Sequence, residues 1–439
     1  MKPFVIKDKF IPCGRISLPG DKSIAHRALI ISAFSSGKTT IDNFPVHDDS
    51  SATLKAMVIL GIKLLRTDKQ VLVWGRPRQG LLKPRKPIFV YNSGTTLRLL
   101  LGVLAGQNFN TKLVAGRYLS RRPMARVNLP LRLMGAQIIA KNKGLEEYPP
   151  IVIMGNKLQG ISYRLPIASA QVKSAILLAG LSAQGKTQVI EPIKTRDHTE
   201  RMLKLFGVRI TVKGQKITLD PGRDLVSPGR IYIPGDISSA AFFMVLAAII
   251  PGAKVVIQRV SLNPRRCGII KVLKRMQAEI KVSGFKNNPA QSFEPMGDIM
   301  VSGSRLKGTV INSQEIPSII DELPVLMVAG CFAQGRTVIK GAEELRVKET
   351  DRINSMFWNL KNMGADIRSV KSGTQENIII EGQATLQGAE LKSFGDHRIA
   401  MSMVVAAIAA EGKSRIDDLT CVNKSFPGFL TTLKTLFRV

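Results

Sequence analysis

Cationic and hydroxyl side chains cluster at the start of a strongly apolar segment near the N-terminus. The stretch LPGDKSIAHRALIISA spans residues 18–33. Within it Lys22, Ser23 and Arg27 follow a Pro-Gly break, which ends a strand, and Asp21 or Ser23 can cap the buried helix that follows. A helix N-terminus already carries free N–H groups and partial positive charge, so added cations there favour an anionic ligand. Alternatively, Lys22 and Arg27 simply extend from a core helix to solvent.

Five further stretches repeat this pattern of a polar start and a buried helix. Each continues as a helix rich in Ala, Leu and Val, turns near a glycine and enters a β-branched strand. The six segments are 21–41, 92–113, 168–189, 236–257, 318–339 and 396–416. A second, amphipathic helix follows each, usually with glycine after its last apolar residue as a left-handed stop. Such self-similarity predicts six copies of one βαβαββ unit.

The last copy lacks the strand pair that follows the second helix in the other copies, because the chain ends soon after a helix expected at Phe429–Phe437. We expect the N-terminal segments Phe4–Ile6 and Gly14–Leu18 to supply these strands. The fold class is therefore predicted to be α/β, with two similar domains of three units each. The buried helices lie parallel inside the sheets, as in an inside-out α/β barrel.

This scheme fixes the expected domain boundaries. One domain would comprise residues 21–233, and the other residues 1–20 together with 234–439. The chain would cross between them near Pro19-Gly20 and Pro234-Gly235.

The starts of the six buried helices carry polar and charged side chains that core packing does not require. Five starts are cationic or polar, and one is acidic. They comprise Lys22, Ser23 and Arg27; Asn92, Ser93, Gly94 and Arg98; Ser169, Gln171 and Lys173; Ser238 and Ser239; Asp321 and Glu322; and His397 and Arg398. We therefore expect a cleft between the domains that binds a multiply charged anion.

Composition limits the classes of partner. The chain has 439 residues, and 64 Lys and Arg against 32 Asp and Glu give a net charge of +32 at pH 7. The charges are spread along the chain, without a dense basic tract or aromatic residues interleaved with basic ones, so nucleic-acid binding is not expected. Four distant cysteines argue against zinc sites and disulfides. The longest apolar run, Ala240–Ile250, is too short to span a bilayer, and we expect a soluble, cytoplasmic protein without a membrane partner.

Six motifs in a fixed order resemble the 5-enolpyruvylshikimate-3-phosphate synthase family over essentially the whole chain. They are LPGDKSIAHRA, NSGTTLR (92–98), RRPM (121–124), SAQVKSA (169–175), VKETDR (347–352) and GDHRIAM (395–401). SAQVKSA and RPMARV are typical of one branch. The resemblance implies the enolpyruvyl transferase type of fold. It also implies transfer of the enolpyruvyl group of phosphoenolpyruvate to the 5-hydroxyl of shikimate-3-phosphate, with release of phosphate.

The reaction implied by the resemblance passes through a non-covalent tetrahedral intermediate and needs no metal or organic cofactor. It belongs to chorismate and aromatic amino-acid biosynthesis and is the target of glyphosate. A monomer needs nothing further to complete the site. The alternative is the related UDP-N-acetylglucosamine enolpyruvyl transferase, which usually has a cysteine before its Arg-Pro motif. The corresponding loop here, residues 115–124, contains none.

The resemblance also assigns ligands by motif. Shikimate-3-phosphate would be held by Lys22, Ser23, Arg27, Ser169, Ala170 (through its backbone), Gln171, Asp321 and Lys348. Phosphoenolpyruvate would be held by Lys22, Gly94, Arg122, Gln171, Arg352, Arg398 and Lys424. Arginine forks suit carboxylate and phosphate oxygens.

Asp321 and Glu349 resemble the family's base and acid. Asp321 would accept the proton of the attacking hydroxyl, and Glu349 would protonate C3 of phosphoenolpyruvate, with Lys22 as a further acid. Surrounding cations lower the pKa of a carboxyl, which suits a base, so Glu349 as donor requires partial burial or a proton shared with lysine. Without the resemblance, Asp321 could be a surface capping residue and Glu349 a first-turn charge on a helix over 349–362.

Some positions depart from the family's pattern. Leu99 replaces a common proline after NSGTTLR, and Glu344 replaces a common asparagine before VKETDR. The match around Thr195 and Arg196 is loose, so their contact with the 3-phosphate stays open. His397 could tune the site without a catalytic role.

Overall fold

The structure is a computed structural model. It describes residues 3–7, 9–77, 80–222, 224–284, 293–373, 375–382 and 385–437. The chain divides into two compact units: Gly20–Ile233, and a second unit formed by the N-terminal residues up to Pro19 and most of the chain from Pro234 onward. In the described part of the chain, no helix has both the length and the apolar character needed to cross a membrane. The four cysteines are free.

The unit Gly20–Ile233 holds three four-stranded sheets in its described residues. Their strand orders are β16-β3-β5-β4, β6-β7-β9-β8 and β11-β13-β15-β14. The strands are β3 (Lys38–Asp42), β4 (Lys63–Arg66), β5 (Gln70–Trp74), β6 (Ile88–Phe89), β7 (Asn110–Val114), β8 (Gln137–Lys143), β9 (Glu146–Met154), β11 (Ser162–Arg164), β13 (Thr187–Ile190), β14 (Ile210–Lys213), β15 (Lys216–Leu219) and β16 (Arg230–Tyr232). A short parallel pair adds β10 (Leu158–Gln159) and β12 (Ala183–Gln184).

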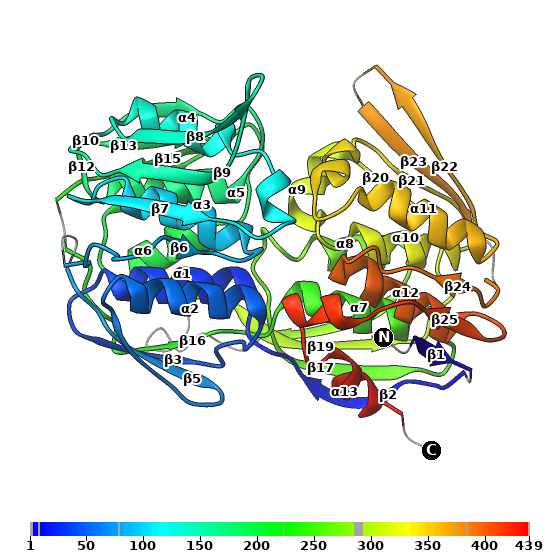
Figure 1. The fold of residues 1–439 in the computed structure, drawn as a ribbon. Coiled ribbons are helices and arrows are strands. Elements are labelled where there is room, and N and C mark those ends of the chain that lie inside the picture. Colours follow the sequence, from blue (N-terminus) through cyan, green and yellow to red (C-terminus); the bar gives the residue numbers. More distant parts are fainter. Residues whose placement is uncertain are drawn as a thin grey trace. The chain divides into compact units, whose positions relative to one another are not determined.

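Three helices of this unit are almost entirely buried: α1 (Lys22–Ala33), α3 (Gly94–Leu104) and α5 (Ala170–Gly180). Helix α3 packs against α1 and α5 (Figure 1). Amphipathic helices follow each of them: α2 (Asp48–Ile59), α4 (Ala125–Leu133) and α6 (His198–Leu205). A 3₁₀ turn, η1 (Leu119–Arg121), precedes α4.

The second unit repeats the plan. Its sheets have the orders β18-β19-β17-β2, β20-β21-β23-β22 and β1-β25-β24. The strands are β1 (Phe4–Ile6), β2 (Cys13–Ser17), β17 (Lys254–Ser261), β18 (Glu279–Gly284), β19 (Met296–Ser302), β20 (Val310–Ile311), β21 (Gly335–Ile339), β22 (Asp366–Ser372), β23 (Gln375–Gly382), β24 (Glu390–Leu391) and β25 (Ser414–Ile416).

Its buried helices are α7 (Ile237–Ile249), α10 (Leu323–Cys331) and α12 (His397–Ala409), which pack against one another. All 13 residues of α7 are buried, as expected for a helix that is apolar on every side. The outer helices are α8 (Gly268–Arg275), α11 (Arg352–Asn362) and α13 (Phe429–Lys434). Shorter turns are η2 (Ser313–Glu315), α9 (Ile316–Ile319), η3 (Glu343–Val347) and η4 (Thr420–Lys424). The predicted α/β fold of buried helices inside sheets is confirmed.

The strands that precede α1 and α7 are exchanged between the units. In the other repeats the strand before the buried helix pairs in parallel with the strand after it, as β6 does with β7 and β20 with β21. The strand before α1, however, is β2, which pairs with β17 after α7. The strand before α7 is β16, which pairs with β3 after α1.

This exchange corrects one expectation about the N-terminus. Strand β1 pairs with β25 of the sixth copy, as predicted, but the second N-terminal strand completes the sheet of the fourth copy instead. In Figure 1 the dark blue strands lie beside the green and red elements of the C-terminal half. The chain passes from one unit to the other directly after β2 and directly after β16. Each of these strands therefore belongs to one unit, while the buried helix that follows it belongs to the other.

Phe293 and Glu294 depart from the expected domain division. They belong to the unit Gly20–Ile233, although the strands on either side, β18 and β19, belong to the other. Glu294 Oε1 lies 2.6 Å from His198 Nδ1, and both side chains are fully buried. The polypeptide therefore enters the first unit a second time between β18 and β19.

Candidate active site

Helix α1 begins at the residues first singled out in the sequence. Asp21, not Ser23, caps it, accepting a hydrogen bond from Ile24 N at 2.9 Å. Lys22 Nζ donates to Asp49 Oδ2 at 3.1 Å, and both side chains are mostly buried. Asp49 lies in the first turn of α2, outside every motif. Asp49 thus holds the ammonium group of Lys22 at the N-terminus of α1.

Arg27 is buried, with 3% of its surface exposed. Its Nε donates to Thr199 Oγ1 at 2.7 Å, and its Nη2 donates to Ser174 Oγ at 2.8 Å. Its Nη1 donates to the carbonyl oxygen of Ser23 at 2.8 Å. Burial first, and the nearby cation Arg196, lower the pKa of Arg27 to about 10, so it stays charged at neutral pH. The explanation that Arg27 only extends to solvent is wrong.

The loop that leads into α6 lies against the same helix start. Arg196 Nη1 donates to Ser23 Oγ at 3.3 Å. The backbone N–H of Thr195 donates to Glu191 Oε1 at 3.1 Å, and its hydroxyl donates to the same oxygen. Glu191 and Glu200 both pair with the buried Lys173, at 3.1 Å and 2.6 Å. Lys173 therefore fixes both ends of the loop that carries Arg196.

The starts of α3 and α5 are joined through Gln171. Arg98 Nη1 donates to Gln171 Oε1 at 2.6 Å, and Gln171 Nε2 donates to Thr95 Oγ1 at 2.9 Å. Ser169 caps α5 by accepting from Val172 N at 3.4 Å. Ala170 is the first residue of that helix, so its backbone N–H lies among the groups with no partner inside the helix.

Gly94, the first residue of α3, lies close to two guanidinium groups. A Cβ at this position would be 2.9 Å from Arg98 Nη1 and 3.2 Å from Arg122 Nη1. The missing side chain thus leaves room for both arginines beside the free N–H groups of the helix. Leu99 is fully buried in the core, and Ser93 still caps the helix. The departure from proline leaves this helix start intact.

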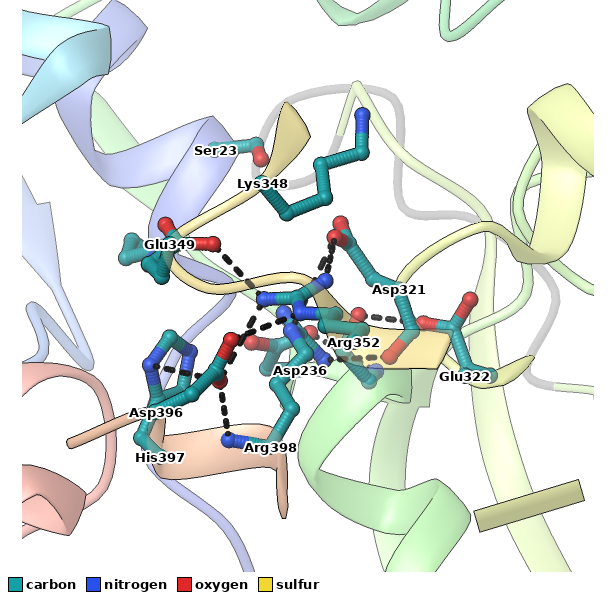
Figure 2. A network of polar contacts seen from close by, with 12 residues as sticks. Ser23, Asp236, Asp321, Glu322, Lys348, Glu349, Arg352, Asp396, His397 and Arg398 are labelled. Atoms are coloured by element: carbon teal, nitrogen blue, oxygen red, sulfur yellow. Dashed lines mark hydrogen bonds and ion pairs between the residues drawn. The ribbon is translucent and has the colours of Figure 1, made fainter. Parts of the chain in front are cut away.

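In the second unit, three carboxylates surround the guanidinium of Arg352 (Figure 2). Arg352 Nε donates to Asp396 Oδ2 at 2.8 Å, and Nη2 donates to Glu349 Oε2 at 2.7 Å. Its Nη1 lies 3.6 Å from Asp321 Oδ1. Burial opposes the charge of Arg352, but the three acids, led by Asp396, raise its pKa above the ordinary value. The cation is therefore permanent.

Arg398 completes the surroundings of Asp321. Its Nε lies 3.6 Å from Asp321 Oδ1, and its Nη1 donates to the backbone carbonyl of Asp321 at 3.2 Å. The side chain of Asp321 is 21% exposed. Two cations beside a partly exposed carboxylate favour its ionised form, which is the form a base needs.

Glu349 and Lys348 lie in the turn before α11. Asp351 caps that helix, so Glu349 is not a first-turn residue of a helix over 349–362. Glu349 Oε1 accepts from Lys424 Nζ at 3.3 Å. Lys348 Nζ donates to Glu344 Oε1 at 2.8 Å, and burial lowers the pKa of Lys348. Glu344, the residue that departs from the family's asparagine, thus supplies an acidic partner.

The structure gathers the predicted residues into one group in each unit. The first group holds Lys22, Ser23, Arg27, Gly94, Arg122, Ser169, Ala170 and Gln171, and the second holds Asp321, Lys348, Glu349, Arg352, Arg398 and Lys424. Sequence reasoning missed the partners Asp49, Thr199, Ser174 and Asp396. Two of them had a signal: Asp396 is the capping residue of the GDHRIAM motif, and Ser174 belongs to the SAQVKSA motif.

Three comparisons with known proteins agree. The family model described as EPSP synthase (3-phosphoshikimate 1-carboxyvinyltransferase) matches residues 13–433. A 3-phosphoshikimate 1-carboxyvinyltransferase of Syntrophomonas wolfei is 48% identical over 424 residues, which are 96% of this chain and 97% of that protein. A Thermoanaerobacter protein of the same name is 46% identical over 98% of this chain and 99% of its own.

Solved structures give the same result. An EPSP synthase structure from Acinetobacter baumannii matches with a TM-score of 0.87 and 42% identity, covering 100% of this chain and 98% of that one. The residues matched by the family model, 13–433, extend over both units and span the positions of all six motifs. The chain therefore belongs to the EPSP synthase (3-phosphoshikimate 1-carboxyvinyltransferase) family.

Proposed function

We propose that this enzyme transfers the enolpyruvyl group of phosphoenolpyruvate to the 5-hydroxyl of shikimate-3-phosphate and releases inorganic phosphate. The proposal rests on the 48% and 46% sequence identity, over nearly the full length, to proteins named for this activity. The two groups of cations at helix starts support it, because the substrates together bring two phosphates and two carboxylates. The relatives do not favour a UDP-sugar acceptor.

Shikimate-3-phosphate is assigned mainly to the unit Gly20–Ile233. Its phosphate would lie at the start of α5, on the Ser169 hydroxyl and the Ala170 N–H. Arg27, fixed by Thr199 and Ser174, would hold the ring substituents together with Lys22 and Ser23. Arg196, which donates to Ser23 Oγ, would add positive charge to this group. From the second unit, Lys348 and Asp321 would contact the acceptor.

Phosphoenolpyruvate is assigned to the arginines of both units. Arg122 and the N–H groups at Gly94 would receive one end of it, and Arg352, Arg398 and Lys424 the other, with Lys22 and Gln171 between the substrates. Guanidinium forks match both of its anionic groups bidentately. Since ligands come from both units, we expect the units to close on the anions, and small-angle scattering with and without shikimate-3-phosphate would detect this.

Asp321 would act as the base in the addition step. It takes the proton of the 5-hydroxyl while that oxygen forms a bond to C2 of phosphoenolpyruvate. A proton is added to C3 at the same time, which gives the tetrahedral intermediate. Loss of a proton from C3 and cleavage of the C2–O bond to phosphate then restore the C2–C3 double bond, which is now part of an enol ether, and release phosphate, so atoms and charges balance.

Glu349 would supply the proton to C3, with Lys22 as a further acid. In this structure both oxygens of Glu349 accept from cations, Arg352 and Lys424, which favours the carboxylate. Phosphoenolpyruvate would compete for both cations through its own negative charges. Glu349 would then lose its partners in a partly buried position and become a proton donor.

The test is phosphate release by the purified protein with both substrates. We expect release that depends on shikimate-3-phosphate and is absent when UDP-N-acetylglucosamine replaces it. Release with only the amino sugar would establish the alternative function. We also propose that the enzyme is cytoplasmic, and that it is a monomer because all of its proposed ligands come from one chain. Light scattering on the same preparation would measure its mass.

A further inference from the structure

A buried ion pair lies directly beside Asp321 and is not part of the proposed substrate contacts. Arg266 Nη2 lies 3.1 Å from Glu322 Oε1, and Arg266 Nη1 lies 3.5 Å from Glu322 Oε2. The hydroxyl of Ser238 donates to Glu322 Oε1 and accepts from Arg266 Nη2. Arg266 is 1% exposed and Glu322 is fully buried.

The three residues come from the starts of three helices. Glu322 is the residue before α10, and its carbonyl accepts from Leu326 N at 3.0 Å. Ser238 lies in the first turn of α7, and Arg266 lies just before α8. The side chain of Glu322 therefore ties the start of α10 to the starts of α7 and α8.

Asp321 is the next residue along the chain and faces the charged group around Arg352. In Figure 2, Asp321 and Glu322 lie side by side, and Asp321 reaches toward Arg352. The backbone at this point is held from two sides. Arg398 donates to the carbonyl of Asp321, and the Arg266–Ser238 pair holds the side chain of Glu322. The carboxylate of Asp321 lies 3.6 Å from Arg352 and from Arg398, so its distance to both arginines depends on where this backbone is held.

A buried ion pair of this kind has no obvious value for stability. Desolvation of the two charges offsets most of their attraction, and apolar residues of similar size are often as stable in such positions. A positioning role is a more direct explanation, because the ion pair and its bridging hydroxyl fix the side chain of Glu322 in one place. We propose that Arg266 is a positioning residue that, through Glu322, sets the location of the Asp321 carboxylate; this rests on the proposed role of Asp321 as base.

The test removes the pair without leaving a buried charge. In Arg266→Met/Glu322→Met, apolar side chains of comparable length replace both ions, so we expect a folded protein with a melting temperature close to that of the unmodified enzyme. Displacement of the base should lower kcat about 10²-fold, while KM for phosphoenolpyruvate stays within about threefold because none of its proposed ligands is moved or replaced. The control is Arg275→Met/Glu315→Met, which removes a partly exposed pair of the same unit and should leave kcat unchanged.

Ser238→Ala provides a second, milder variant should the double variant fail to fold. It removes only the bridging hydroxyl, and we expect a several-fold loss of kcat with unchanged KM for phosphoenolpyruvate. A kcat within twofold of the unmodified enzyme in the double variant, or in Ser238→Ala if only that one folds, would overturn the positioning role, as would equal losses in kcat and in phosphoenolpyruvate affinity. If the unmodified chain released no phosphate from either acceptor, the proposed function itself would fall, and this role with it.

Discussion

Lys22 Nζ donates a hydrogen bond to Asp49 Oδ2 at 3.1 Å, so the first cation of helix α1 has a fixed acidic partner. Asp49→Asn removes the charge that orients this ammonium. We expect kcat/KM to fall about tenfold for both substrates, which corresponds to about 1.4 kcal/mol. Asp366→Asn, at an exposed surface pair, is the matched control and should have no effect. A variant with unchanged steady-state kinetics for both substrates would show that Lys22 needs no such partner.

The proposed base and acid can be separated from binding. Asp321→Asn and Glu349→Gln keep the shape of each side chain, so we expect both substrates to bind nearly as before. Loss of a proton acceptor or donor should reduce kcat by about 10²- to 10⁴-fold. Isothermal titration would measure binding, and single-turnover phosphate release would measure chemistry. Near-native turnover in either variant contradicts that residue's assignment.

Binding of phosphoenolpyruvate should be coupled to the uptake of a proton by the enzyme. If the substrate takes Lys424 and Arg352 away from Glu349, that carboxylate loses two stabilising cations and its pKa rises on binding. Calorimetry in buffers of different ionisation enthalpy should then show uptake of up to about one proton per site near neutral pH. Glu349→Gln should abolish the uptake and still bind. Equal uptake in this variant would place the proton elsewhere.

Gly94→Ala should affect glyphosate more than phosphoenolpyruvate, since the inhibitor expected for this family is slightly longer than the substrate. The added methyl would lie against Arg98 and Arg122, and such crowding costs roughly 1–3 kcal/mol. We expect at least about a tenfold weaker inhibition constant, with a smaller rise in the KM for phosphoenolpyruvate. Inhibition assays on both proteins decide the matter: equal losses would assign Gly94 to packing alone.

Acid should destabilise the enzyme partly through His26. Burial lowers the pKa of this histidine from 6.5 to about 3. Between these values the unfolded chain binds a proton that the folded chain does not, so the free energy of unfolding falls as pH falls. His26→Asn, which can still bond to Thr53, should flatten this dependence by up to about 1.4 kcal/mol per pH unit. Urea unfolding at pH 7, 6, 5 and 4 would measure it. An unchanged slope would mean that His26 is protonated in the folded state.

The sequence predicted the buried helices well because apolar residues on every side leave a helix only one place, the core. The starts of α1, α3 and α5 could likewise be located from Pro-Gly, Asn-Ser-Gly and Ser-Ala-Gln. The exchange of β2 and β16 could not be predicted from the sequence, because every repeat has the same strand pattern. Which strand pairs with which is decided only when the sheets of each unit assemble.

The sequence also did not predict the hydrogen-bonding partners of the site residues. Asp49 and Thr199 come from the outer helices α2 and α6, whose sequences resemble ordinary amphipathic surface helices. Nothing local distinguishes an acid that will meet Lys22 from one that faces water. The alternative interpretation of Glu349 as a first-turn residue began the helix at 349, whereas α11 begins at Arg352 after its cap Asp351, and aspartate is a common residue in that position.

The exchanged strands also set an order of events on the ribosome. By the time residue 233 has emerged, every strand of the sheets in the unit Gly20–Ile233 has been synthesised, and that unit can begin to fold. The N-terminal residues made first must wait much longer. Strand β2 needs β17, strand β1 needs β25, and Cys13 N bonds to Leu436 O at 3.1 Å. These early segments are therefore among the last to pair, and until β17 and β25 have been synthesised they remain accessible to proteases and chaperones.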